Sequence, residues 1–150
     1  MLIEEAVYKL LSTDSGVIAL VGGRIFSGVL PQDLEGYPAI AYRAPATGNR
    51  RVIQVMEGGC SLVSQRIHVF SADKGKRKYG TAAELDAAVS IALNDYSGVV
   101  SIPATSPLES IDVQAIFQTT LAHAYGFDDK TQTHNFVTEF EIHYTDPNLI

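Results

Sequence analysis

Two histidines and two aspartates near the end of the chain are residue types that could bind a metal. In residues 111–125, before Asp128 and Asp129, the odd-numbered positions are the more apolar. In residues 134–144, after them, the even-numbered positions are the more apolar. A hairpin centred between the two aspartates would put both apolar sets on one face and set His123 directly opposite His134. Two imidazoles and two carboxylates can bind a transition metal. The alternative is that both histidines lie at the solvated tip of the hairpin, because no third ligand follows at a known spacing.

The same hairpin register also predicts which apolar side chains pair. It sets Phe117 opposite Phe140 and Leu121 opposite Phe136, with all four on one face of a sheet. The aspartates would then lie in the turn, where they are candidates for contact with a partner.

Cys60 and His68 are the other pair that could do chemistry, as a nucleophile and its base. On one extended strand, eight residues separate two side chains by roughly 26 Å, which is far beyond hydrogen-bond reach. The sequence has no G-x-S-x-G motif, and Asp14-Ser15-Gly16 is more simply a turn. We therefore expect no catalytic residue and no cofactor, which favours a structural or binding role over an enzyme.

The glycines of "VGGRIFSG" raise the question of a phosphate-binding loop. A Walker loop needs Lys-Ser/Thr after two spaced glycines, and a dinucleotide site needs G-x-G-x-x-G between a strand and a helix. Here Gly22 and Gly23 follow a helix-like run and precede a strand-like one, which is the reverse order. The pattern predicts a helix stop with a left-handed cap.

Composition and charge narrow the classes of partner. The chain has 150 residues and a net charge of -6, which argues against a protein that coats nucleic acid. No apolar run is long enough to span a membrane, so we expect no membrane contact. One basic cluster is predicted to be a solvated loop, with a docking patch for an acidic surface as the alternative. Its members are Lys74, Lys76, Arg77 and Lys78.

The periodicity of the apolar residues predicts one α+β domain over residues 1–150. Helices are expected at 2–11 and after Thr81, where a capping box begins. Strands are expected at 38–43, at 61–72 and in the two arms of the hairpin. These elements predict a mainly antiparallel sheet of about five to six strands, with a mixed sheet as the alternative, and two main helices packed on one face.

Residues 44–59 form a polar, glycine-rich excursion with an apolar patch in its middle. The excursion is either a mobile arm or a β-hairpin. Such a patch is typical of an oligomer contact, and a plain core strand is the alternative. The candidate contact residues are Arg50, Arg51, Val52, Ile53 and Val55.

The order of several segments resembles one protein family. The helix ending in "LLSTDSGVIALVGGRIFSGVLPQD" is followed by "YPAIAYR", by the strand "SQRIHVFSAD" and by the helix "AAELDAAVSIALND", and the last strand is "FVTEFEIHYTD". This series is similar to the tail terminator, or tail completion, proteins of long-tailed bacteriophages, prophages and gene transfer agents.

The resemblance implies a structural subunit without enzymatic activity or a cofactor. Such subunits close into a ring of about six copies on the last ring of the tail tube, built of the tail tube protein. There they stop its polymerisation and offer a surface to the head-tail connector or stopper protein. The resemblance further implies that DNA passes through the ring without being specifically bound, and that the protein lies at the tail-head junction of the virion after assembly in the bacterial cytoplasm. Residues 44–59 and the hairpin tip at 126–134 are candidate halves of the ring interface.

Two other interpretations stay open. The chain could be a different component of the same particle, such as a head-tail joining or minor tail protein. It could instead be a small ligand-binding α+β domain, in which Cys60, Arg66 and His68 line a pocket from one face of a strand.

Overall fold

Three helices and eight strands make up the fold. The computed structural model describes residues 3–31, 34, 36–45, 50–55, 61–75, 79–102, 109–119, 124–130 and 132–146. The elements are α1 (Ile3–Thr13), α2 (Ser15–Val21), β1 (Ile25–Ser27), β2 (Ala39–Arg43), β3 (Arg51–Val55), β4 (Ser61–Lys74), α3 (Tyr79–Leu93), β5 (Gly98–Ile102), β6 (Glu109–Gln118), β7 (Ala124–Asp128) and β8 (Thr133–Asp146). The α+β class is confirmed, and α2 is the short helix-like run that precedes Gly22, but the sheet is larger than the predicted five to six strands.

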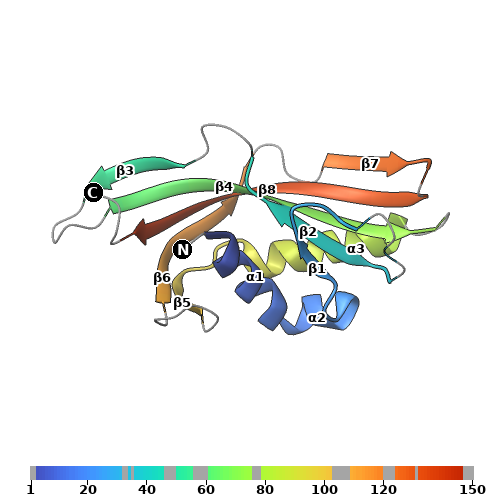
Figure 1. Cartoon of the computed structure of the whole chain (residues 1–150), viewed down its shortest axis with the longest axis horizontal. Helices are drawn as coiled ribbons and strands as arrows, with labels where there is room; N and C mark the ends of the chain where they lie inside the picture. Colours follow the sequence, from blue (N-terminus) through green and yellow to red (C-terminus); the bar gives the residue numbers. More distant parts are fainter. Residues whose placement is uncertain are drawn as a thin grey trace.

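Two long antiparallel strands, β4 and β8, form the centre of the sheet (Figure 1). Each has two shorter partners along its other edge: β3 and β2 lie beside β4, and β7 and β6 lie beside β8. At the far edges β5 pairs antiparallel with β6, whereas β1 pairs parallel with β2. The sheet is therefore mixed, and each of its two ends has a different set of strands.

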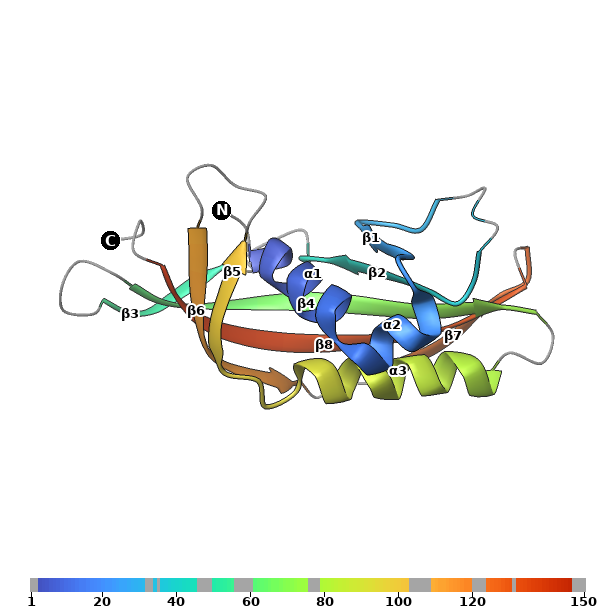
Figure 2. The same ribbon diagram turned by 90° about the horizontal axis from the view of Figure 1, so that it is seen from below.

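All three helices pack on the same face of the sheet (Figure 1, Figure 2). Their apolar stripes meet the inward side chains of the central strands, and each fully buried side chain of this kind contributes roughly 1.5–3 kcal/mol. Fully buried members of this core include Val7, Leu11, Val17, Ile67, Leu85, Val89, Leu93, Phe140 and Ile142. Within the described residues, no helix combines the length and apolar character that crossing a membrane requires.

The turn between α1 and α2 is built on Asp14, which was predicted to lie in a plain turn. Its carboxylate accepts a hydrogen bond from the amide of Val17 at 3.0 Å, so Asp14 is the N-cap of α2. α2 ends at Gly22, whose φ of 61° is unfavourable for residues with a Cβ. The predicted helix stop before a strand is confirmed.

The third helix begins earlier than its sequence signal indicated. α3 starts at Tyr79, so Thr81 lies inside the first turn and the predicted capping box is wrong. An N-cap residue needs a non-helical backbone, which Thr81 lacks. The predicted buried stripe is confirmed at Leu85, Val89 and Leu93.

The predicted register of β6 against β8 is confirmed before a β-bulge, where Val113 lies opposite Tyr144, and is wrong after it. A β-bulge between Val113 and Ala115 inserts one extra residue into β6. Side chains after the bulge therefore turn to the opposite face. Phe117 pairs with Glu141 instead of Phe140 and lies on the face away from the helices.

The second half of the predicted arm is a separate strand with a register of its own. β7 sets Tyr125 opposite Phe136, the place predicted for Leu121, which lies outside the described residues. The turn lies about two residues later than predicted, because Asp128 still pairs with Thr133 as the last residue of β7 and Asp129 begins the turn. The register of β7 differs from the predicted one because this turn follows Asp128 instead of being centred between the two aspartates. β6 and β7 are also two separate strands, which pair with different halves of β8.

Candidate assembly surfaces

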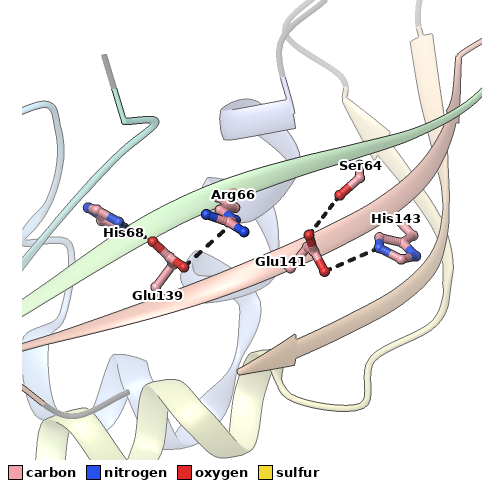
Figure 3. A network of polar contacts seen from close by, with 6 residues as sticks. All are labelled: Ser64, Arg66, His68, Glu139, Glu141 and His143. Atoms are coloured by element: carbon pink, nitrogen blue, oxygen red, sulfur yellow. Dashed lines mark hydrogen bonds and ion pairs between the residues drawn. The ribbon is translucent and has the colours of Figure 1, made fainter. Parts of the chain in front are cut away.

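The face of the sheet opposite the helices carries a row of polar side chains, which we call the outer face (Figure 3). These side chains alternate mostly with buried apolar residues of the same strands, and with the partly buried Gln65 in β4, because successive residues of a strand point to opposite faces. The members of the outer face are Ser64, Arg66 and His68 from β4, and Glu139, Glu141 and His143 from β8.

Glu139 is nearly buried in the outer face, with 6% of its surface exposed. His68 Nε2 donates a hydrogen bond to Glu139 Oε2 at 2.7 Å, and Arg66 Nε lies 3.9 Å from Oε1. Burial raises the pKa of Glu139, but hydrogen bonds from His68 and Thr119 and the positive charges of His68 and Arg66 outweigh it and hold the pKa below its usual value. Glu139 is therefore ionised at neutral pH.

A second carboxylate on the outer face, that of Glu141, links β8 to β4 two residues beyond Glu139 along β8. Ser64 Oγ donates a hydrogen bond to Glu141 Oε1 at 3.0 Å, and His143 Nε2 lies 3.5 Å from Oε2. The ring of Phe117 meets the ring of His143 edge to face, with centroids 5.1 Å apart. Since both carboxylates are held by neighbouring side chains, the outer face is an ordered polar surface rather than an acid–base pair aimed at a substrate.

The predicted pairing of His123 with His134 is wrong. His134 lies opposite Phe127 in the β7 register, and His123 lies outside the described residues. The Nδ1 atom of His134 is 2.7 Å from the hydroxyl oxygen of Tyr125, and its ring packs beside Tyr79. In the part of the chain that the structure describes, no three His, Cys, Asp or Glu residues are grouped closely enough to hold a metal ion.

The apolar patch predicted within residues 44–59 is the edge strand β3. Its described residues form one arm of a hairpin with the start of β4, which favours the hairpin over the mobile arm. The alternative of a core strand is wrong, because all five residues of β3, including Arg51, are exposed. Val52 is 42% exposed, Ile53 44% and Val55 60%. Arg50, directly before the strand, is also exposed.

The hairpin tip that joins β7 to β8 also exposes large apolar side chains. Tyr125 is 47% exposed and Phe127 41%. Asp128 at the end of β7 and Asp129 in the turn are both exposed, and Asp128 Oδ1 accepts a hydrogen bond from the amide of Lys130 at 3.0 Å. Aromatic side chains next to charged residues on a surface are typical of protein contacts.

The predicted basic cluster is described only in part. Lys74 is exposed at the end of β4, opposite Thr133 of β8. Lys76, Arg77 and Lys78 lie outside the described residues.

A cleft of about 610 Å³ lies between the connection from β1 to β2 and the hairpin tip. Phe70 and Val137 are among its apolar lining residues, and His68 contributes a polar one. Arg66 is not among the described residues that line it, and Cys60 lies outside the described residues. The predicted pocket of these three residues therefore reduces to His68.

The chain matches a known protein family. The family model described as "Tail completion protein gp17" matches residues 5–144. The chain belongs to the tail completion protein family. The match extends from α1 into β8, so it includes the central strands β4 and β8 and the shorter strands β3 and β7 of this tail completion protein. The resemblance noted in the sequence is thereby confirmed, and the chain is a structural protein of phage tails.

The tail completion fold has a counterpart among solved structures. A chain in the structure titled "Virion of native gene transfer agent (GTA) particle" aligns with a TM-score of 0.67, over 96% of this chain and 95% of that chain. The two sequences are 18% identical, so the likeness shows the fold. A comparison with curated proteins gave no match.

Sequence reasoning missed the carboxylates of the outer face in this tail completion protein. Glu139, Glu141 and His143 alternate with Phe140 and Ile142 along β8. That alternation was available as a signal of one polar and one apolar face. The side chains that bond to these carboxylates could not be predicted, because they depend on the pairing of β8 with β4, which is far away in the sequence.

Proposed function

We propose that this tail completion protein is a tail terminator. It forms a ring of about six copies on the end of the tail tube, stops the tube from growing and offers a surface for head attachment. The observation that carries the proposal is the family match over residues 5–144, which extends over nearly the whole fold. The protein acts by assembly and not as an enzyme.

The arrangement of the edge strands supports assembly into a ring. A closed ring requires a heterologous interface, in which one patch of a subunit meets a different patch of its neighbour. β3 and the hairpin tip are two different surfaces, and both expose apolar side chains. The partners in the particle are further copies of this chain, the tail tube protein, and a head-tail connector or stopper protein.

The charge of the chain supports passage of DNA through such a ring. The net charge is -6, and two carboxylates lie on the outer face. Binding to nucleic acid depends mainly on neutralising phosphate charges, so an acidic subunit holds DNA weakly. On this proposal the protein is part of the virion at the tail-head junction, after assembly in the bacterial cytoplasm.

A tube-capping assay tests the terminator role. Tail tube protein is polymerised with rising amounts of the chain, and tube lengths are measured by negative-stain microscopy. We expect tubes to shorten and to end in a ring-shaped cap, while light scattering of the free chain at high concentration shows a species of about six copies. Tubes of unchanged length at every ratio would overturn the role.

The main alternative is a head-tail joining or minor tail protein of the same particle. Such a protein also belongs to an assembly and lacks catalysis. It differs in its target, because it would attach to DNA-filled heads or to the side of the tail instead of the growing tube end. Labelled chain added separately to heads and to tubes distinguishes these roles by the particle with which it sediments.

The cleft of about 610 Å³ favours a second alternative, a small ligand-binding domain. Its volume and its apolar lining are those of many small-molecule sites. A thermal-shift screen with His68→Ala as the comparison tests this role. A ligand that stabilises the wild-type chain and not the variant supports it, and the absence of any stabilising ligand counts against it.

A further inference from the structure

Two edge strands of equal length lie at opposite ends of this molecule. β3 and β7 each have five residues. Within the described residues β3 pairs with β4 alone and β7 pairs with β8 alone, so each has one edge without a strand beside it. Such an edge presents backbone donors and acceptors that can pair with another chain.

The two open edges lie at positions that suit neighbouring copies. β3 lies beside Ser61–Ser64 of β4, and β7 lies beside Thr133–Val137 of β8, which is opposite the last residues of β4 (Figure 1). About ten residues of extended strand separate the two places, or roughly 33 Å. β3 lies along the outer edge of β4 and β7 along the outer edge of β8. Because the two central strands cross in Figure 1, both β3 and β7 lie on the upper side of the sheet in that view.

Strand directions determine how two copies would pair. β3 is antiparallel to β4 and β7 is antiparallel to β8, while β4 and β8 are antiparallel to each other. β3 therefore runs against the direction of β7. A neighbour turned about the long axis of the sheet and shifted by about half its length brings its β7 antiparallel to this β3.

We propose that β3 of one copy pairs with β7 of the next copy, so that the sheets of neighbouring subunits join into one continuous sheet. The proposal rests on the proposed ring and names the contact that builds it. One register satisfies both strands. Arg51 lies opposite Asp128 with complementary charge, and Val52 lies opposite Phe127.

The β-bulge in β3 keeps this register consistent beyond Val52. The bulge lies between Val52 and Gln54, so it accommodates Ile53 as the extra residue. After it, Gln54 lies opposite Gly126 and Val55 opposite Tyr125. Side chains that face the helix side on one strand thus meet side chains that face the same side on the other.

Burial supports the choice of a second copy as the occupant. Val52, Val55, Tyr125 and Phe127 are each between 41% and 60% exposed, and all four become neighbours in this register. The receiving surface is already ordered, because the rings of Tyr79 and Phe136 lie 5.1 Å and 5.2 Å from that of Tyr125. The side chains of this surface therefore lose little conformational freedom when the aliphatic side chains of β3 pack against them.

Disulfide trapping tests the contact itself. Cys60 is the one cysteine of the sequence, so Cys60→Ser removes the native thiol. In that background one chain carries Val52→Cys, and a second, size-tagged chain carries Phe127→Cys. Directly opposed residues of antiparallel strands lie about 4.5–5.5 Å apart between Cα atoms, which a disulfide can span. We expect the mixed chains to form a covalent heterodimer on mild oxidation.

Two matched controls define the result. Val52→Cys mixed with Val99→Cys places the second thiol on β5, at an exposed valine outside the proposed contact. Val52→Cys mixed with Tyr125→Cys tests a slipped register. Cross-linking with Phe127→Cys at least tenfold faster than with either control supports the proposal, and equal rates overturn it.

Charge reversal provides a test that needs no new thiols near the strands. Arg51→Glu and Asp128→Lys should each slow formation of the heterodimer or ring about fivefold, and the two together should restore it. Circular dichroism verifies that each variant folds. Losses that simply add in the double variant overturn the pairing of these two residues.

The tube-capping assay separates failure of the contact from failure of the terminator role. Capping without selective cross-linking overturns the pairing of β3 with β7 and retains the role. Selective cross-linking without capping supports the pairing and overturns the role.

Discussion

The two faces of the sheet come from the same two strands and differ in how they are held. On the helix side, Phe140 and Ile142 are almost fully buried beneath three helices. On the outer face, Glu139, Glu141 and His143 alternate with them and bond across to β4. No helix covers the outer face in Figure 1, yet Glu139 is nearly as buried as the core.

This difference indicates a division of roles between the faces. The helix side gains stability from apolar burial, which is non-directional and large. The outer face gains order from hydrogen bonds and charges, which contribute less to stability and fix side-chain positions. Matched substitutions on the two faces should therefore differ in size, and four of them test the comparison.

Phe140→Ala should have the largest effect. Phe140 is fully buried under the helices, and removing a buried phenyl ring loses its transfer free energy and leaves a cavity. We expect a loss of about 3–5 kcal/mol in the free energy of unfolding, measured by urea denaturation. A loss below about 1 kcal/mol would contradict the view that this face holds the fold together.

Thr138→Val should have the next largest effect, because it removes a polar contact from the helix side. Thr138 Oγ1 donates a hydrogen bond of 2.7 Å to Asp86 Oδ1, and both residues are buried. A bond lost to a buried carboxylate costs about 1–3 kcal/mol. Thr145→Val on the same strand is the control, because Thr145 is only partly buried, and it should change urea stability by less than about 0.5 kcal/mol.

Glu139→Gln should cost less, about 1–2 kcal/mol at neutral pH, because the outer face relies on a charged hydrogen bond. Against the effect of burial, hydrogen bonds from His68 and Thr119 hold the pKa of Glu139 below its usual value in the folded state. Its ionised form therefore stabilises the fold above the unfolded pKa, and this contribution is lost as pH falls through the folded pKa. The difference from wild type should therefore shrink as pH falls from neutral into the acid range, in urea denaturation measured at each pH.

Glu141→Gln is the matched control for the Glu139 variant. Glu141 accepts its close bond from a neutral serine, and its histidine partner is 3.5 Å away instead of 2.7 Å. We expect a smaller loss than for Glu139→Gln. If the two variants lose the same free energy of unfolding at every pH, the charge of Glu139 does not account for its contribution to stability.

Local patterns in the sequence predicted the elements that depend on near neighbours. The helix at the N-terminus, the stop at Gly22 and the buried stripe of α3 follow from spacing within a few residues. The turn after Asp128 was predicted to within about two residues for the same reason. The start of α3 was not, because Thr81 carries the signal of a cap while the helix continues to Tyr79.

Features that depend on distant pairing were not predictable. The bulge after Val113 has no glycine or proline to mark it, and it reverses the side on which Phe117 lies. The contact of His68 with Glu139 joins residues 71 positions apart, so it needs the register of β4 against β8. Among the candidate contact residues, β3 and the hairpin aspartates could be named from composition, but their places at opposite ends of the sheet could not.

Phe117→Ala should have the smallest effect of the four, apart from the controls, and makes the sharpest contrast with Phe140→Ala. The same residue type is changed on the same sheet, but Phe117 is 37% exposed and packs edge to face against His143 on the outer face. The lost ring contact is worth about 0.5–1.5 kcal/mol, and the open position leaves no closed cavity. A loss as large as that of Phe140→Ala in urea denaturation would mean that the outer face also carries the fold, and the division of roles between the faces would be wrong.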